Sequence, residues 1–424
     1  MLATNHHNKN GQHPPTSLKG GIHSMDLKTI LSSEPAYRLK QIEQAWFNVG
    51  INSYEEITTL PVDLREKLKD TPWLCLTPHT IHQSQQDNTR RILFQLHDGK
   101  FIETVLMGRK NLKKGHQAAS LSSSLEEEVA HRPEESSSNR YTICVSSQVG
   151  CPMRCVFCAT GRTGFKRNLS AEEIIDQYRY CQRVLAKENA RVNNIVVMGQ
   201  GEPLLNYDNL KKALQVLLKN TDLGETKITV STAGIPAVMD QLLADKDFPK
   251  VRWAVSLHSA IEETRKQIMP SHKKDFLNFL VDWTNRYRQL IPSRTHFIGL
   301  EYIMLHGIND DDKHLKALIK LANRMPHIRI NLIPFNTSGG DVPPSGSARL
   351  SSSLEEEVAR RPEESSETFL RSASDTIDHW HQSLMAAGFT STIRYSQGQD
   401  IYAACGQLEN FTSKNPQNKE PSTK

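Results

Sequence analysis

Six short apolar runs alternate with amphipathic stretches between residues 138 and 408, and this alternation constrains the fold more than any other feature of the chain. Apolar runs of strand length, separated by helical patterns, predict βα units and a parallel sheet. The expected strands are Tyr141–Ser146, Asn194–Met198, Lys227–Ser231, Val251–Leu257, Phe297–Met304 and Ile328–Pro334, with helices near 171–186, 208–218, 236–244, 274–289, 312–323 and 373–387. Six such units predict an α/β fold, a partial (β/α)6 barrel whose chemistry lies at the carboxyl ends of its strands.

A smaller domain is expected before the barrel, over residues 25–110. Its first half reads as two helices, one over residues 37–47 and one near 64–68. Its second half reads as a β-hairpin, because the apolar runs 91–96 and 101–106 flank an Asp98-Gly99 turn signal. The sequence therefore predicts a small helical and β-hairpin domain joined to the barrel.

Several segments are too polar to contribute to a core. Residues 1–24 and 409–424 read as disordered ends. Residues 122–137 and 351–366 carry nearly the same sequence, SSSLEEEVAHRPEESS and SSSLEEEVARRPEESS, at unrelated places. Two separated copies do not make a repeat fold, so we interpret residues 120–137 and 349–366 as inserts on surface loops. A pair of docking motifs is the alternative.

Charge and composition set limits on partners and location. The formal net charge of +5 permits an RNA partner but does not require one. No apolar run is long enough to cross a bilayer, and the N-terminus lacks the apolar core of a secretory signal. We therefore expect a cytoplasmic protein with no membrane contact, in which seven cysteines serve metal binding or catalysis rather than a disulfide scaffold.

Three of these cysteines form a tight motif after the first barrel strand, Cys151-Pro-Met-Arg-Cys155-Val-Phe-Cys158. Thiolates are the ligands of iron–sulfur clusters. Three of them hold three irons of a [4Fe–4S] cluster and leave the fourth open for a chelating cofactor such as S-adenosylmethionine. A structural zinc site is the alternative, but zinc prefers four closed ligands and no second Cys/His pair lies nearby in the sequence. The motif therefore favours a radical S-adenosylmethionine site.

Small and polar residues end the following strands. Gly201 and Glu202 follow the second strand, where glycine lets a ligand approach the backbone and a carboxylate can accept from an ammonium group. The other predicted strand-end residues are Ser231, Ser256, Leu257, His258 and Asn336. Each alone fits an ordinary turn, but together they ring the mouth of one barrel.

With these residues the chain resembles the RlmN/Cfr family of radical enzymes, most closely the dual-specificity adenine-C2 RNA methyltransferases. The resemblance runs from about Tyr37 to Leu408, interrupted by the two inserts. It is most specific in CVSSQVGC at 144–151, MGQGEPLLN at 198–206 and DIYAACGQL at 400–408. It implies a radical SAM barrel over 138–408 and an RNA-binding accessory domain over 25–110. It also implies methylation at C2 of adenine 2503 in 23S rRNA and of adenine 37 in tRNA.

The resemblance also implies roles for three residues outside the cluster motif. Cys405 matches the methyl carrier, which becomes S-methylcysteine. Cys144 matches the cysteine that later forms a transient disulfide with this carrier. Glu103 matches the family's proton acceptor, although a Glu on a hairpin strand is by default a solvated residue. Two S-adenosylmethionine molecules are consumed per methylation, one for the thiol and one as the radical source.

The cofactors implied are a [4Fe–4S] cluster on Cys151, Cys155 and Cys158 and S-adenosylmethionine. Gly201 and Glu202 match positions that contact its amino group. Ser231, Ser256–His258 and Asn336 match further contacts to its ribose, adenine and carboxylate. The partners implied for a monomeric enzyme are 23S rRNA, tRNA and an electron donor such as flavodoxin or ferredoxin. Phosphate contacts are expected from two basic groups, Arg162, Lys166 and Arg167, and Lys110, Lys113 and Lys114, although the second group reads equally well as a solvated charge run.

Some features depart from the family pattern or leave alternatives open. Gln200 stands where the family has Met, and the inserts interrupt connections between active-site parts. Cys75 and Cys181 match nothing functional and read as structural. Methylation at C8 of the same rRNA adenine uses the same cysteines. A non-catalytic iron–sulfur or zinc RNA-binding protein is the alternative of a different class.

Overall fold

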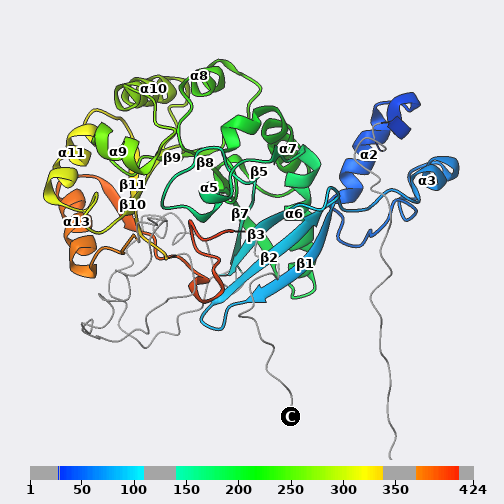
Figure 1. Ribbon diagram of the computed structural model, residues 1–424. Coiled ribbons are helices and arrows are strands. Elements are labelled where there is room, and N and C mark those ends of the chain that lie inside the picture. Colours follow the sequence, from blue (N-terminus) through cyan, green and yellow to red (C-terminus); the bar gives the residue numbers. More distant parts are fainter. Residues whose placement is uncertain (1–26, 28, 109–139, 338–368, 410–424) are drawn as a thin grey trace, which may run out of the picture.

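The structure is a computed structural model that describes residues 27, 29–108, 140–337 and 369–409. The predicted disordered ends, both inserts and Lys110, Lys113 and Lys114 lie outside the described residues. Ten strands form one curved sheet in the order β1-β2-β3-β4-β7-β8-β9-β10-β11-β12 (Figure 1). They are β1 (Leu76–Gln83), β2 (Asn88–Leu96), β3 (Phe101–Gly108), β4 (Arg140–Cys144), β7 (Arg191–Val197), β8 (Ile228–Thr232), β9 (Arg252–Ser256), β10 (Ile298–Met304), β11 (Ile328–Pro334) and β12 (Thr390–Ile393).

The strands from β4 to β12 pair in parallel, as in a partial barrel, which confirms the predicted fold class. All six predicted barrel strands are present within a few residues of the expected bounds. The structure adds β12, which pairs with β11, and β1, which extends the predicted hairpin. The strand β3 pairs antiparallel with β4, so the hairpin strands continue the barrel sheet directly. The predicted boundary between the two domains stays a prediction.

Helices surround the barrel strands on their outer side, and two further helices, α2 (Tyr37–Trp46) and α3 (Val62–Leu68), lie in a lobe beyond β1 (Figure 1). The other helices are α5 (Ala159–Thr163), α6 (Ala171–Ala186), α7 (Tyr207–Asn220), α8 (Pro236–Ala244), α9 (Glu262–Ile268), α10 (Phe276–Leu290), α11 (Asp312–Ala322) and α13 (Ser374–Ala386). The helix α6 begins with a capping box, in which Ser170 Oγ accepts from Glu173 N and Glu173 Oε2 accepts from Ser170 N. Among the described residues, no helix is long and apolar enough to span a membrane.

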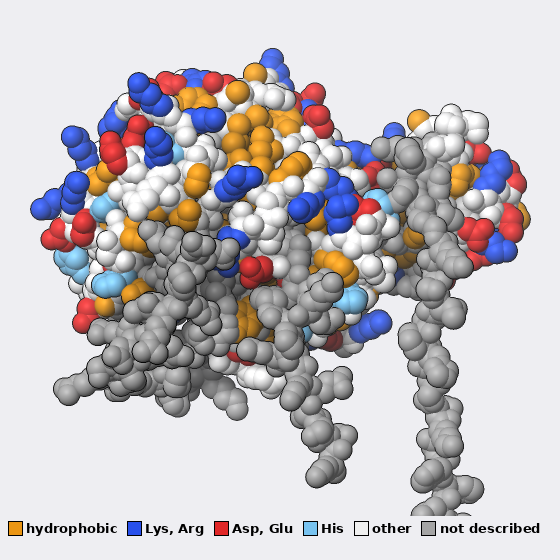
Figure 2. All heavy atoms as spheres, viewed as in Figure 1, with side chains coloured by type: hydrophobic (Ala, Val, Ile, Leu, Met, Phe, Trp, Pro, Cys, Tyr) orange, Lys and Arg blue, Asp and Glu red, His pale blue; other side chains and the backbone are white. Residues whose placement is uncertain are grey.

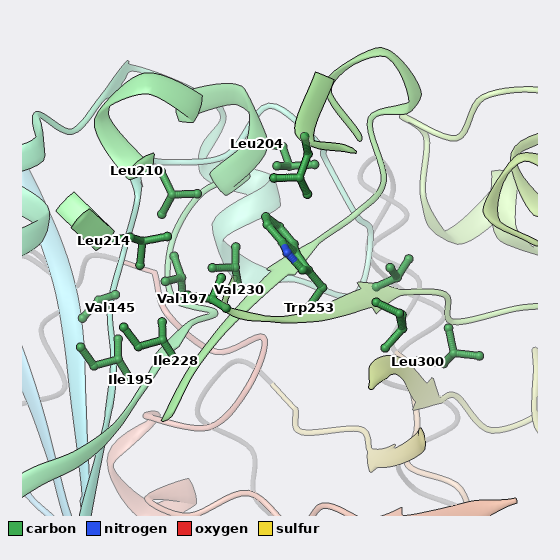
Figure 3. Close-up of a cluster of buried hydrophobic side chains, with 14 of the residues drawn as sticks. Val145, Ile195, Val197, Leu204, Leu210, Leu214, Ile228, Val230, Trp253 and Leu300 are labelled. Carbon is green, nitrogen blue, oxygen red and sulfur yellow. The ribbon is translucent and has the colours of Figure 1, made fainter. Parts of the chain in front are cut away.

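The main core lies between the sheet and these helices. Figure 3 shows Val145, Ile195, Val197, Ile228 and Val230 near the side chains of α7. Because parallel strands are covered on their outer face by helices, alternating β-branched residues pack outward against them. The other alternate positions point inward, toward the mouth, where the predicted site residues lie.

The antiparallel strands divide their residues between two faces. Ile92, Phe94 and Ile102 belong to the main core. Thr89, Arg91 and Leu93 of β2 lie opposite Met107, Val105 and Glu103 of β3, on the other face. The segment after β12 (red in Figure 1) crosses to this face, where Ala403 and Leu408 pack against Val105 and Cys144. Residues distant in sequence therefore meet where the barrel ends.

Candidate active site

The three-cysteine motif forms a loop whose backbone allows little substitution. Gly150 has a φ of +71°, and a Cβ there would lie 1.7 Å from the carbonyl oxygen of Gly164. Cys158 directly precedes α5, and its N–H donates to the Cys155 carbonyl at 3.1 Å. The Val156 N–H donates to the Ile268 carbonyl at 3.1 Å, which ties the loop to α9. The loop therefore presents its thiols from a fixed position at the barrel mouth.

The thiols of Cys151, Cys155 and Cys158 share one electrostatic neighbourhood. Burial raises the pKa of all three, to about 12 for Cys151, and the negative charge of the neighbouring thiolates raises the pKa of Cys151 and Cys155 further. Only a nearby cation makes such a set of thiolates favourable. Their burial and mutual repulsion therefore suit a site where bound iron replaces the thiol protons.

A cluster and a single ion make different demands on their ligands. Among the described residues, no group of three or more His, Cys, Asp and Glu side chains converges closely enough to hold one metal ion. A tetrahedral zinc ion requires such convergence, because all its ligands bind one atom. In an iron–sulfur cluster each thiolate binds a different iron, so the thiolates stand farther apart. The three-cysteine set fits a cluster better than zinc.

Glu202 lies at the carboxyl end of β7, next to the end of β8. Its Oε1 accepts from Leu204 N at 3.0 Å and from Thr232 Oγ1 at 2.7 Å, and its Oε2 accepts from Ala233 N at 2.7 Å. A carboxylate has about four acceptor positions, so one remains for an ammonium group. Burial raises the pKa of Glu202, while these donors oppose the rise. The neighbouring Gly201 has a φ of +107°, and a Cβ there would lie 2.6 Å from Gln148.

The ends of β8 and β9 are organised by Arg265, a fully buried residue of α9. It donates to the carbonyl groups of Ala233, Ser256 and Leu257 at 2.7, 3.2 and 3.2 Å. Burial lowers its pKa to about 10, and the Cys155 thiolate opposes this. Ser231 and Ser256 are half-buried at the inner ends of their strands, whereas the side chain of Leu257 is buried in the core. The Leu257 N–H donates to the Glu301 carbonyl at 3.0 Å, so both backbone polar groups of Leu257 are bonded within the protein.

His258 is a neutral ring held against the cysteine loop. Burial, with the charge of Arg265, lowers its pKa to about 3. Its Nδ1 accepts from the Ile303 N–H at 3.0 Å, and its ring meets Phe157 edge-on with centroids 4.8 Å apart. Its φ of +54° lies in the left-handed region. The structure thus places the ring between the cysteine loop and β10.

Cys405 lies on an exposed loop that docks on the three-cysteine motif. The Ala159 N–H, directly after Cys158, donates to the Gly406 carbonyl at 2.8 Å. Thr160 Oγ1 donates to the Leu408 carbonyl at 2.7 Å. Asn336 Nδ2 donates to the Cys405 carbonyl at 3.3 Å and to Ser396 Oγ at 2.9 Å. The loop is therefore anchored on both sides of Cys405.

Cys144 faces this loop from the end of β4. Both Cys144 and Cys405 are free thiols, so the predicted disulfide is not formed in this structure. Burial raises the pKa of Cys144 to about 12, and the Cys405 thiolate adds to the rise. Arg394 opposes it, because its guanidinium lies near both thiols. Arg394 Nη1 also donates to Glu301 Oε2 at 2.9 Å and lies 3.8 Å from Met198 Sδ.

Glu103 is buried, at 1% exposure, rather than solvated as a hairpin Glu is by default. Its side chain lies on the face of β3 that the Cys405 loop covers. The Oε1 atom of Glu103 is 3.6 Å from Nη1 of Arg91. Ser146 Oγ donates to the Glu103 carbonyl at 2.6 Å and accepts from the Gln200 N–H at 2.9 Å. The structure thus brings Glu103, Cys144 and Cys405 to one side of the barrel mouth.

Sequence reasoning missed Arg265, Glu301, Asn331 and Arg394. Glu301 lies beside Ser256 and Asn331 in register, and Asn331 Nδ2 donates to Glu301 Oε1 at 2.7 Å. A signal existed, because Glu301 and Asn331 interrupt otherwise apolar strands that should face a core. Arg394 and Arg265 carry no such signal, since their burial depends on contacts between distant segments.

The predicted phosphate-binding residues after the cysteine loop differ in availability. Arg162 and Lys166 are exposed. Arg167 instead binds both carboxylate oxygens of Glu173 at 2.8 Å and Asp98 Oδ2 at 2.8 Å. These bonds join the hairpin to α6. They also occupy the Arg167 guanidinium, which is therefore less available to a phosphate group than the side chain of Lys166. Figure 2 shows Lys and Arg side chains scattered over this face rather than gathered in one continuous patch.

The comparisons with known proteins agree with this site. The radical SAM superfamily profile matches residues 145–319, a span that contains the three cluster cysteines and Glu202. A crystal structure of a radical SAM methyltransferase from Sphaerobacter thermophilus is 30% identical, with a TM-score of 0.71, over 92% of this chain and 98% of that one. The chain belongs to the radical SAM superfamily. Its fold is that of a radical SAM methyltransferase, and it is an S-adenosylmethionine-dependent enzyme.

A more distant match is a domain of a pyruvate-formate lyase-activating enzyme from Bacteroides vulgatus ATCC 8482. It is 15% identical with a TM-score of 0.32, over 48% of this chain and 99% of that domain, and it carries no argument here. Membership of the radical SAM superfamily implies a [4Fe–4S] cluster and S-adenosylmethionine. Cys144, Cys405 and Glu103 lie outside the profile match, so their roles rest on geometry and on the resemblance.

Proposed function

We propose that the protein methylates C2 of adenine in 23S rRNA and in tRNA, with Cys405 as the methyl carrier. The supporting observation is the position of Cys405. Its loop is bonded to the residues that follow Cys158, and its thiol shares the guanidinium of Arg394 with Cys144. A thiol at that position reaches both a cofactor bound at the cysteine loop and a second thiol. This is the arrangement that a thiol-relayed methyl transfer requires.

The first step belongs to Cys405. Its side chain is exposed, so it is accessible to the methyl group of a bound S-adenosylmethionine. As a thiolate, it displaces the sulfonium sulfur. A bond forms between the Cys405 sulfur and the methyl carbon, and S-adenosylhomocysteine leaves. The charge of Arg394 and the Asn336 bond to the Cys405 carbonyl orient the thiol for this displacement.

The second step joins the methyl carbon to adenine. When bound, the [4Fe–4S] cluster would supply the electron that cleaves a second S-adenosylmethionine, and the adenosyl fragment released would take one hydrogen atom from the methyl group on Cys405, so that this carbon can bond to C2. The adduct on Cys405 then gives up one electron, which the oxidised cluster would take back, and the C2 proton, which Glu103 accepts. The guanidinium of Arg91, 3.6 Å from Glu103 Oε1, places a positive charge beside this buried carboxylate.

Cys144 releases the product. Its thiolate attacks the Cys405 sulfur, so that an S–S bond forms and the bond between sulfur and the new methyl carbon breaks. The electron pair of the broken bond stays with the carbon, and a proton from solvent completes the methyl group. The resulting disulfide returns to two thiols with two electrons from an external reductant, such as a thiol.

Anaerobically reconstituted enzyme tests this proposal directly. It is incubated with reductant, tRNA or a 23S rRNA fragment, and S-adenosylmethionine whose methyl group carries deuterium. Nucleosides are then separated after nuclease digestion and identified by mass spectrometry. The expected product is 2-methyladenosine in which one deuterium has been replaced by hydrogen. Production of 8-methyladenosine, full retention of the deuterium, or no methylated adenosine contradicts the proposal.

Two cysteine variants supply the matched control. Cys405→Ala removes the carrier, so we expect no methylated nucleoside. Cys181→Ala changes a thiol that is fully buried in the main core, away from the site, and we expect turnover to persist. A non-catalytic iron–sulfur RNA-binding protein predicts instead that neither variant alters its function.

A further inference from the structure

Arg91 lies on β2, in the face that the Cys405 loop covers, and it is nearly fully buried. Burial lowers its pKa, and the carboxylate of Glu103 opposes that change. An arginine is seldom buried unless it is paired. Its neighbour Arg90 points to the opposite face, where its side chain is partly exposed and pairs with Glu188 at 2.7 Å. Two adjacent arginines therefore occupy two different environments.

Two contacts of Arg91 join different parts of the site. Its Nη1 lies 3.6 Å from Glu103 Oε1 and donates to the Tyr402 carbonyl at 3.3 Å. Glu103 lies on β3, whereas Tyr402 lies three residues before Cys405 on the loop. Tyr402 has a φ of +53°, a backbone conformation that L-residues seldom adopt unless their surroundings impose it. One guanidinium therefore contacts both the carboxylate and the loop at its turn.

The rest of the loop is anchored on either side of this contact. Before Tyr402, Asp400 accepts from Ser84 Oγ and Gln85 N, and Asp87 accepts from Gly398 N at 2.9 Å. After Cys405, the loop is bonded to α5. Arg91 contacts the segment between these anchors through its hydrogen bond to the Tyr402 carbonyl. A loop held at both ends needs no further cation for its attachment, so the charge of Arg91 serves Glu103.

We infer that Arg91 is a positioning residue, which holds the Glu103 carboxylate in place beneath the Cys405 loop and ties its placement to that loop. This inference rests on the proposed function. The adduct between Cys405 and adenine loses its C2 proton to Glu103, and the electrons of the C–H bond remain in the adenine ring. Arg91 therefore acts on Glu103, the proton acceptor of this step. The earlier methylation of Cys405 does not use Glu103, so it does not depend on the charge of Arg91.

The test compares three substitutions in the reconstituted full chain. Arg91→Lys retains a positive charge, Arg91→Gln retains a donor for the Tyr402 carbonyl without the charge, and Arg90→Met is the matched control on the opposite face. Each protein is assayed for the methyl group on Cys405 by peptide mass, for 2-methyladenosine, and for covalent adduct between protein and RNA on denaturing gels.

For Arg91→Gln we expect Cys405 methylation at the wild-type level, a fall of tenfold or more in 2-methyladenosine, and accumulation of the covalent adduct. Arg91→Lys should recover a large part of the turnover, and Arg90→Met should match wild type. Equal turnover in the Lys and Gln variants overturns the inference, as does parallel loss of both methylation steps. If Arg91→Lys fails to fold, Arg91→Gln alone is compared with wild type for the ratio of adduct to product, and if Arg91→Gln fails to fold, Arg91→Met takes its place. An unchanged ratio in the variant without the charge overturns the inference. Absence of 2-methyladenosine with the wild-type enzyme contradicts the proposed function instead.

Discussion

At the scale of single residues, the site depends on buried charged groups that lie next to groups of opposite charge. In the proposed mechanism Cys144 must become a thiolate to attack the Cys405 sulfur, yet burial raises its pKa to about 12. Arg394 is the side-chain cation that opposes this rise, and Glu301 holds its guanidinium in place at 2.9 Å. The release of product therefore depends on an ion pair that no sequence motif marks.

Removal of this cation should slow product release and shift its pH dependence. In the double variant Glu301→Gln/Arg394→Met, which leaves no buried charge unpaired, the pKa of Cys144 rises further and the thiolate fraction falls at every pH below it. Each unit of rise lowers the rate of a thiolate-limited step about tenfold. The pH profile of turnover should move to higher pH, while Arg394→Lys stays near wild type. An unchanged profile in the double variant contradicts this role.

The neutral ring of His258 makes stability depend on pH in a definite window. Its pKa falls from an ordinary value near 6.5 to about 3 in the folded protein. The unfolded chain therefore binds a proton more readily below about pH 6.5, and stability that is complete above this pH is lost as the pH falls. As the pH falls from 7 to 5, protonation of His258 in the unfolded chain lowers the free energy of unfolding by about 2 kcal/mol.

The variant His258→Asn tests this window, because Asn keeps a hydrogen-bond acceptor and tolerates the left-handed backbone. Its unfolding free energy in urea should fall by about 2 kcal/mol less than that of wild type between pH 7 and pH 5. Equal losses in the two proteins would show that His258 is not the group that titrates.

At the scale of elements, the antiparallel strands β1–β3 serve as a platform for the Cys405 loop. Asp400 of the loop accepts from Ser84 Oγ at 2.8 Å and from Gln85 N at 2.9 Å, in the turn between β1 and β2. Gly398 has a φ of +65°, and a Cβ there would lie 2.7 Å from Thr89 Cγ2. The hairpin that carries Glu103 therefore also holds the segment before Cys405.

Loss of this anchor should loosen the loop without unfolding the barrel. Hydrogen bonds to a charged group contribute about 1.5–3 kcal/mol each, so Asp400→Ala should increase hydrogen exchange in residues 397–405 about tenfold or more. Cys405 methylation should fall with it, while the thermal midpoint stays near that of wild type. Asp375→Ala, on the exposed face of α13, is the control. A loop that exchanges as slowly in Asp400→Ala as in wild type excludes the platform role.

At the scale of the whole molecule, α2 and α3 form a lobe beyond β1–β3 (Figure 1) and attach to the barrel through Arg179 of α6. Arg179 is buried and pairs with Asp176. It donates to the Trp46 carbonyl at 3.2 Å, and its guanidinium lies 5.0 and 4.9 Å from the ring centroids of Trp46 and Trp73. Arg183, one turn along α6, also donates to the carbonyl groups of Asn48, Val49 and Ile51, so two arginines of α6 join the lobe to the barrel.

Removing one partner of a buried ion pair costs about 3–5 kcal/mol, because the other charge stays buried. Arg179→Met should lower the free energy of unfolding by that amount, measured by urea denaturation. Arg191→Met breaks an exposed pair with Asp222 and should cost less than about 1 kcal/mol. Similar losses in the two variants would rule out Arg179 as a link.

Much of the barrel could be predicted from the sequence, because its strands are apolar runs and α6 begins with a capping pattern. β1 was missed because Thr77, Pro78 and His79 give it no strand-like alternation. The burial of Glu103 could not be predicted, since it depends on a loop from the far end of the chain. The same holds for Arg394 and Arg91, whose partners lie on distant segments.

The central claim is that Cys405 carries the methyl group, and the mass of the peptide that contains Cys405 tests it most directly. The reconstituted enzyme is incubated with deuterium-labelled S-adenosylmethionine without RNA, digested and measured. The account predicts one labelled methyl group on Cys405 and none on Cys144, and loss of that label when the labelled cofactor is removed and RNA, reductant and unlabelled S-adenosylmethionine are added. An unmodified Cys405, or a label that persists while RNA becomes methylated, would contradict the account.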